Sequence, residues 1–188
     1  MEEEEGEQMT RFYGVLILFV ALFVITSVTA AHENVNYDYL IGNEFLEEFG
    51  PVMAKARNGD TIEFKGGGTF STKPKTATGT GTFIHRNADG DIIGAGVWTA
   101  TDLITFKSYG SGSFQELPAE FEGGRALIRV YLDPDPRIPG FNGVLKVTCL
   151  LGNKIPPKAQ EGVQLLVRDA KINFNREMGG ATLFIREE

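Results

Sequence analysis

Gly66-Gly67-Gly68-Thr69-Phe70 is the first of four stretches that share one pattern: Gly-x-Gly, then Thr, Val or Ser, then an aromatic residue. The other three lie at residues 79–83, 94–98 and 110–114, at spacings of 13, 15 and 16 residues. Such spacings are typical of successive β-strands joined by tight turns. Because side chains alternate along a strand, we expect both glycines and the aromatic residue of each stretch to share one face. Glycines there allow a sharp bend, and an aromatic ring can cover the gap.

A curled series of strands tends to close on itself, because closure removes exposed strand edges. We therefore predict an all-β, mainly antiparallel fold: a single β-barrel of about 8–10 strands, preceded by one short helix. A two-sheet β-sandwich is the alternative. The layout is similar in general plan to lipocalin-type, allene-oxide-cyclase-type and dirigent-type barrels. This resemblance concerns the plan alone and assigns no role to any residue.

Local patterns predict where the elements begin and end. Residues 44–57 are expected to be helical, because apolar side chains recur on roughly one face, with Asn43 as N-cap and Pro51 splitting or starting the helix. Asp89-Gly90 predicts a hairpin turn. The stretch from Gly96 to Phe106 is too long for one ordinary strand, so we expect a bend near residues 100–102. Strands are predicted at 61–65, 68–73, 80–86, 91–100, 102–109, 125–132, 143–150, 163–168, 170–175 and 181–187.

Composition limits the classes of function. The chain has 188 residues, of which 42% are hydrophobic, and this is compatible with one domain that has a real core. Residues 1–30 hold five glutamates and one arginine, so the rest of the chain carries a net charge of only −3. No cluster of Lys and Arg alternates with aromatic residues, so nucleic acid is not an expected partner. Cys149 is the only cysteine, and with two histidines the sequence predicts no disulfide, metal site or cofactor.

The N-terminal region indicates export. Residues 13–25 are uncharged and apolar, and small residues follow, so a signal peptide cleaved after Ala30, or after the neighbouring Ala31, is predicted. Residues 2–5 are acidic where a signal peptide is normally basic, which leads to the hypothesis that translation starts at Met9. We thus expect a secreted or extracytoplasmic protein. The alternative is a membrane anchor formed by residues 13–31, the only expected contact with a membrane.

Three segments follow from these patterns. Residues 1–31 are predicted to be the signal peptide or anchor, residues 32–60 a lead-in with the short helix, and residues 61–188 the β-barrel domain.

Side-chain alternation also selects candidate site residues. His85 shares a face with Phe83, and Asp102 shares a face with Trp98 and Ile104, so both are expected to point inward. The two polar residues are the weak candidates for catalysis, because a histidine or a carboxyl group inside a cavity can act as a base. The five residues predicted to line a ligand cavity are Phe83, His85, Trp98, Asp102 and Phe106. Cys149 falls on an apolar face, and no spacing brings it to His85 and Asp102.

Three functions remain open. The leading hypothesis is a non-enzymatic binding module for a small apolar molecule held inside the barrel. The second is a barrel enzyme of the cyclase or isomerase kind that uses His85 or Asp102. The third is a structural or surface protein with a solid core. An internal cavity above about 300 Å³ lined by Phe83, Trp98 and Phe106 would favour binding, and a filled interior would favour the third hypothesis.

Overall fold

The computed structural model describes residues 34–134 and 139–187. The predicted signal peptide or anchor, the start at Met9 and the cleavage site after Ala30 lie outside the described residues. The described residues belong to one compact unit. Among the described residues, no helix is both long and apolar enough to cross a membrane.

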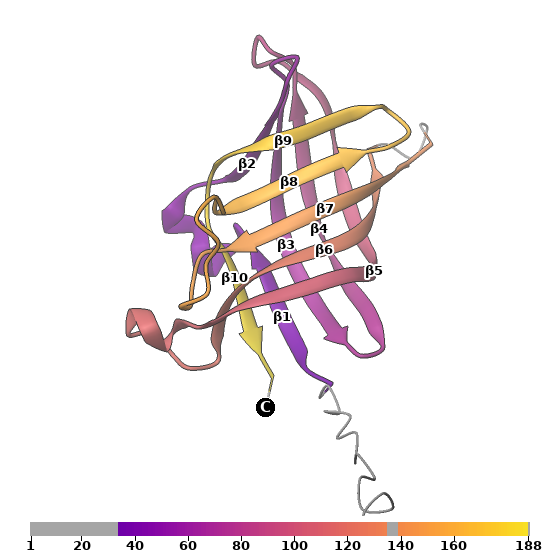
Figure 1. Ribbon diagram of the computed structural model, residues 1–188. Helices are drawn as coiled ribbons and strands as arrows, with labels where there is room; N and C mark the ends of the chain where they lie inside the picture. The colour runs from indigo at the N-terminus through magenta and orange to yellow at the C-terminus, as the bar shows by residue number, and fades with distance from the viewer. Residues whose placement is uncertain (1–33, 135–138, 188) are drawn as a thin grey trace, which may run out of the picture. The chain divides into compact units, whose positions relative to one another are not determined.

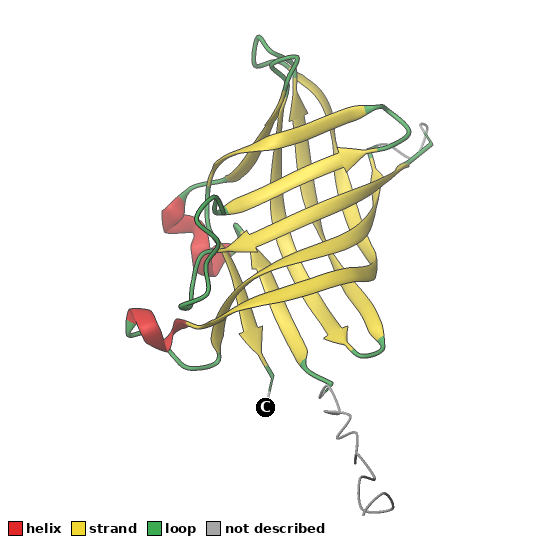
Figure 2. Ribbon diagram, in the orientation of Figure 1, coloured by secondary structure: helices red, strands yellow, loops and turns green. Residues whose placement is uncertain are grey.

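Ten strands form one antiparallel sheet, which closes in a ring of eight strands (Figures 1 and 2). The all-β prediction of about 8–10 strands is therefore confirmed, although the ring is not evenly barrel-like. Two short 3₁₀ helices, η1 (Glu44–Phe49) and η2 (Gly112–Gln115), interrupt the strands. The strands are β1 (Asn36–Ile41), β2 (Val52–Ala56), β3 (Thr61–Thr72), β4 (Lys75–Arg86), β5 (Ile92–Ser111), β6 (Phe121–Asp133), β7 (Phe141–Cys149), β8 (Gly162–Val167), β9 (Ile172–Gly179) and β10 (Thr182–Arg186).

Two long strands change partners along their length, and this divides the sheet into two arms. β3 pairs with β2 over residues 61–64 and with β1 over residues 66–71. β6 pairs with β10 at residues 121–122 and with β7 over residues 124–132. β2, β9, β8 and β7 thus close one arm, and β1 and β10 close the other. We call the line along which the two arms separate the seam. The helix η1, which connects β1 to β2, crosses it.

The interior of the ring is filled by an aromatic core. Ring contacts run from Phe83 through Phe64 and Trp98 to Tyr39 and Phe70, with centroids 6.1–6.5 Å apart. Trp98 is fully buried, and its Nε1–H donates to the Lys65 carbonyl at 3.1 Å. Aromatic burial at this density is the main stabilising contribution to such a core. Phe70 also packs, at centroid distances of 4.9–5.8 Å, against Phe106, Tyr37 and Phe184.

The first two glycine stretches face each other across β3 and β4. Gly66 lies opposite Gly81, and a Cβ atom on Gly81 would overlap the Lys65 carbonyl oxygen and lie 2.7 Å from Nε1 of Trp98. The glycines therefore let the indole ring approach the backbone, as the sequence predicts. The fourth stretch departs from the pattern: Phe114 lies on η2 and is exposed, because a helical turn replaces the strand there.

The predicted helix at residues 44–57 is only half correct. The helical part ends at Phe49, because Gly50 adopts a φ of 78° and Pro51 follows. Residues 52–56 then alternate between buried and partly buried positions, which is the pattern of a strand. The short helix does not precede the barrel either, because β1 comes before it. β1 and β2, both inside the predicted lead-in at 32–60, are strands of the sheet.

Two predictions about β4 and β5 are confirmed. The hairpin at Asp89-Gly90 forms, and the Asn87 side-chain oxygen accepts from the backbone N–H groups of Asp89 and Asp91 at 3.0 and 2.8 Å. β5 bends through a β-bulge between Ala100 and Asp102. The bulge inserts an extra residue, so the inward face changes phase and Leu103 becomes buried.

Candidate functional site

The structure does not bring the five predicted ligand-binding residues into one cavity. Phe83 and Trp98 both contact Phe64 in the aromatic core, whereas Phe106 packs at the other side of that core against Tyr37. No cavity found among the described residues is lined by Phe83, Trp98 and Phe106 together. Their role in binding a ligand stays a prediction, and the filled interior does not support it.

The prediction that Asp102 points inward is wrong. Its side chain is exposed, because the bulge after Ala100 shifts the alternation by one position. His85 lines a hollow on the end of the ring near Phe174, and Cys149 lines a different groove. These three residues therefore form no triad.

His85 is held by a carboxylate. Its Nε2 lies 3.0 Å from Oδ2 of Asp60, and its ring makes an edge-on contact with Phe174 at 5.2 Å. His85, but not Asp60, lines an apolar hollow of about 320 Å³, and Phe83 is also in the wall of this hollow. A histidine oriented by a carboxylate is the arrangement of a general base, and it is equally a common structural pair.

A concave site larger than this hollow lies at the seam. It is a groove of about 560 Å³, built from η1, the segment between η2 and β6, the end of β7 and the start of β10. Figures 1 and 2 show the two short helices on the side of the ring where the loop between β7 and β8 lies. The wall of the groove is mostly apolar. It includes Phe45, Leu46, Phe49, Leu117, Phe121, Leu151 and Leu183.

The rim of this groove exposes large apolar side chains. Phe45 and Phe49 on η1 are 61% and 57% exposed, and Leu117 is 40% exposed. Phe45 also packs edge-on against Phe121 at 6.1 Å, which holds η1 beside the start of β6. Apolar side chains gathered at the mouth of a concave site mark a binding surface more often than scattered ones do.

A single carboxyl group joins the two arms at the seam. Glu161 accepts from the backbone N–H of Leu150 at 2.6 Å and from that of Thr182 at 2.8 Å. The arms have separated at this point, so neither N–H group has a strand partner, and the carboxyl oxygens take the place of a strand. The Thr182 hydroxyl lies 2.8 Å from Oε1 of Glu161 and 2.7 Å from the Thr148 carbonyl oxygen, so one proton serves two acceptors.

Burial governs the ionisation of both titratable groups beside Thr182. Desolvation raises the pKa of Glu161, and the hydrogen bonds from Thr182 and Leu150 oppose this only in part. Desolvation, with the charge of Glu161 as a smaller cause, also raises the pKa of Cys149 far above that of an ordinary thiol. The buried Cys149 is therefore a small apolar residue of the groove wall and not a nucleophile.

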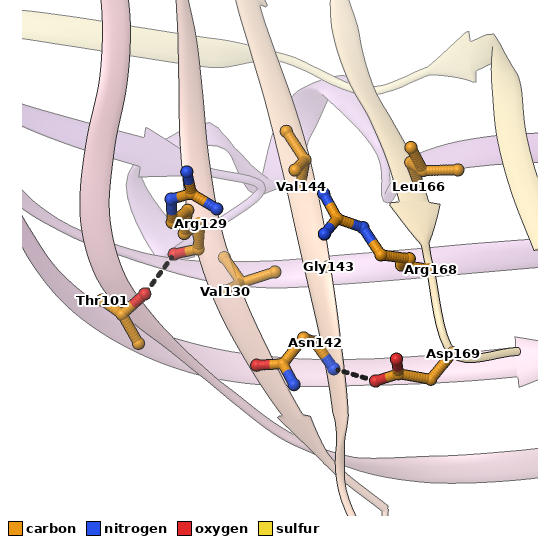
Figure 3. Close-up of a pocket in the computed structure, with 9 residues that line it drawn as sticks. All are labelled: Thr101, Arg129, Val130, Asn142, Gly143, Val144, Leu166, Arg168 and Asp169. Carbon is orange, nitrogen blue, oxygen red and sulfur yellow. Dashed lines mark hydrogen bonds between the residues drawn. The ribbon is translucent and has the colours of Figure 1, made fainter.

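A second hollow, of about 220 Å³, lies on the outer face of β6, β7 and β8 (Figure 3). Arg129 and Arg168 flank Val144 there, and the Asn142 backbone N–H donates to Asp169 at 3.0 Å. Asp102 pairs in register with Arg129 across β5 and β6. The lining itself holds two arginines, Arg129 and Arg168, and one aspartate, Asp169, so the hollow has a small excess of positive charge.

The groove could not have been found from spacing, because its residues come from five separate segments of the chain. The apolar residues of the predicted helix and the Gly-rich segment between Tyr109 and Arg125 are the only sequence signals for the groove. In the part of the chain that the structure describes, no group of three or more His, Cys, Asp or Glu side chains is arranged to hold a metal ion. Comparisons of the chain with family models, with curated proteins and with solved structures found no match.

Proposed function

We propose that this protein binds a small apolar molecule, and that it does so in the groove at the seam rather than inside the ring. The single observation that carries the proposal is the groove itself: about 560 Å³, apolar, and rimmed by the exposed Phe45 and Phe49. Sites for small molecules have volumes of about 300–1,000 Å³, mostly apolar walls and a few polar groups. Glu161 is such a polar group.

The shape of the fold supports the same choice. The ring interior is occupied by Trp98, Phe64 and their neighbours, so a ligand there would have to displace fully buried rings. At the seam the two arms separate, and no strand fills the space between them. A ligand in the groove would cover the phenylalanines of the rim and remove their apolar surface from water. Each Å² of apolar surface removed from water contributes about 25 cal/mol to the free energy of binding.

A neutral fluorescent probe tests the proposal. N-phenyl-1-naphthylamine should bind with a blue-shifted, enhanced emission, and the double variant Phe45→Ala/Phe49→Ala should weaken its binding about tenfold, or ~1.4 kcal/mol. The matched control is Ile92→Ala/Val97→Ala, which removes two exposed apolar side chains that line no hollow. The control should leave the affinity unchanged.

Two results would contradict the proposal. One is the absence of saturable binding by the probe and by a panel of apolar metabolites. The other is equal loss of binding in both double variants, which would mean that the probe adheres to apolar surface anywhere on the protein. Gel filtration of the wild type checks whether a second copy covers the groove; a dimer that Phe45→Ala/Phe49→Ala dissociates would also overturn small-molecule binding.

A cyclase or isomerase is the second candidate, and the His85–Asp60 pair is the one observation that favours it. Its apolar hollow holds a histidine that could move a proton while the walls exclude water. Turnover of an apolar substrate panel that is lost in His85→Ala and retained in Phe45→Ala/Phe49→Ala would favour this candidate over binding at the seam.

A further inference from the structure

The charged side chains that line the groove are acidic. Glu48 lies on η1 at the rim, and Glu161 lies at the seam. Among the described residues that line the groove, none is a lysine, an arginine or a histidine. Lys154 and Lys158, on the loop between β7 and β8, are exposed and do not line it.

Further acidic residues lie on the segments that build the groove. η1 also carries Glu44 and Glu47, and Glu116 and Glu120 lie between η2 and β6. All four are exposed. Lys154 and Lys158 offset part of this charge, so the acidic excess is clearest in the lining itself, where Glu48 and Glu161 lie.

Glu161 adds an acidic group to the groove wall. Its Oε1 accepts from the N–H and from the hydroxyl of Thr182, and its Oε2 accepts from the N–H of Leu150. A carboxyl group in the wall disfavours a ligand carboxylate beside it. A primary ammonium group carries three donors and no acceptor, so it is the group that an acidic wall complements.

We infer that the groove selects apolar molecules that carry a protonated amine over those that carry a carboxylate. The inference rests on the proposed function and adds the chemical class of the ligand. The alkyl part lies against Phe45, Phe49, Leu117 and Leu183, and the ammonium group lies between Glu48 and Glu161. A ligand carboxylate in the same place meets acidic groups and finds no cation among the described residues that line the groove, so the anionic analogue binds more weakly.

The test uses three ligands with the same ten-carbon chain: decylamine, decanol and decanoate. Each displaces N-phenyl-1-naphthylamine from the wild-type protein at pH 7, below its critical micelle concentration. We expect decylamine to displace the probe at a concentration about tenfold lower than decanoate, with decanol between them. Raising the salt concentration should reduce this ratio, because part of the attraction comes from exposed glutamates.

Variants assign the preference to the groove. Glu48→Gln should reduce the decylamine-to-decanoate ratio about threefold and leave decanol unchanged. The matched control, Glu47→Gln, changes an exposed residue of the same helix that does not line the groove, and should have a smaller effect. Glu161→Gln should remove most of the remaining preference, and its thermal unfolding shows whether the variant is folded.

The outcomes separate the two proposals. If the probe and all three ligands fail to bind, the proposed function is wrong. If the probe binds and decanoate competes as well as decylamine, the groove binds apolar molecules but the inference is overturned. If decylamine is preferred and Glu48→Gln and Glu161→Gln leave the ratio unchanged, the preference arises elsewhere, and this also overturns the inference.

Discussion

Replacing Glu161 by alanine is the most direct test of how the two arms of the sheet are joined. The substitution removes the acceptor for the N–H groups of Leu150 and Thr182, which lie 2.6 and 2.8 Å from its oxygens. A buried donor left without a partner costs about 1–3 kcal/mol. The groove admits some water to these groups, so the lower half of the range applies to each, and we expect a total loss of about 3 kcal/mol.

Thermal unfolding measures this loss. For a domain of this size, 1 kcal/mol corresponds to about 2–4 °C, so the melting temperature of Glu161→Ala should fall by roughly 6–12 °C. The control is Glu44→Ala, an exposed glutamate of η1, which should change stability by less than about 0.5 kcal/mol. If both variants lost the same small amount, water would satisfy the seam without Glu161, and the reasoning would be wrong.

Three further predictions concern the titration of Glu161, the packing of the glycines and the reactivity of Cys149. Folding raises the pKa of Glu161, so the wild type should lose stability relative to Glu161→Gln as the pH rises from the ordinary pKa of glutamate through the raised pKa. Urea unfolding from pH 4 to 8 measures the free energy of unfolding of both proteins. A difference between them that does not change with pH would contradict this prediction. Gly81→Ala should cost more than about 2 kcal/mol, since its Cβ would overlap the backbone below Trp98, whereas Gly94→Ala, whose nearest neighbour is 3.7 Å away, should cost less than about 1 kcal/mol in the same urea assay. Cys149 should react with a thiol reagent only at the rate of local opening, and rapid labelling of the native protein would contradict its burial.

The sequence predicts most of the β-structure because strand signals are local. Alternating side chains, the Asp89-Gly90 turn and the small glycines beside aromatic residues each act over a few positions. The alternation holds along β6, where Ala126, Ile128 and Val130 are all buried. β2 was missed because Val52 and Met53 follow Leu46 and Phe49 at helical spacing, and only Gly50 and Pro51 break the helix between them.

The candidate site was predicted less well, because side-chain direction depends on register. A single bulge after Ala100 moves Asp102 to the outside, and no local pattern specifies where a long strand accommodates an extra residue. His85 lies in the wall of a hollow, and its partner Asp60 comes from the turn before β3, which alternation along β4 cannot show.

The sequence by itself determined that this chain forms an antiparallel β-protein with an aromatic core, since glycine, aromatic and turn residues act on their own neighbours. Only the tertiary structure decided where a ligand can lie. β3 and β6 each pair with two different strands, so the sheet divides and leaves a seam. Residues as distant in sequence as Phe45 and Leu183 line the groove at that seam, because strand pairing over long separations brings them together.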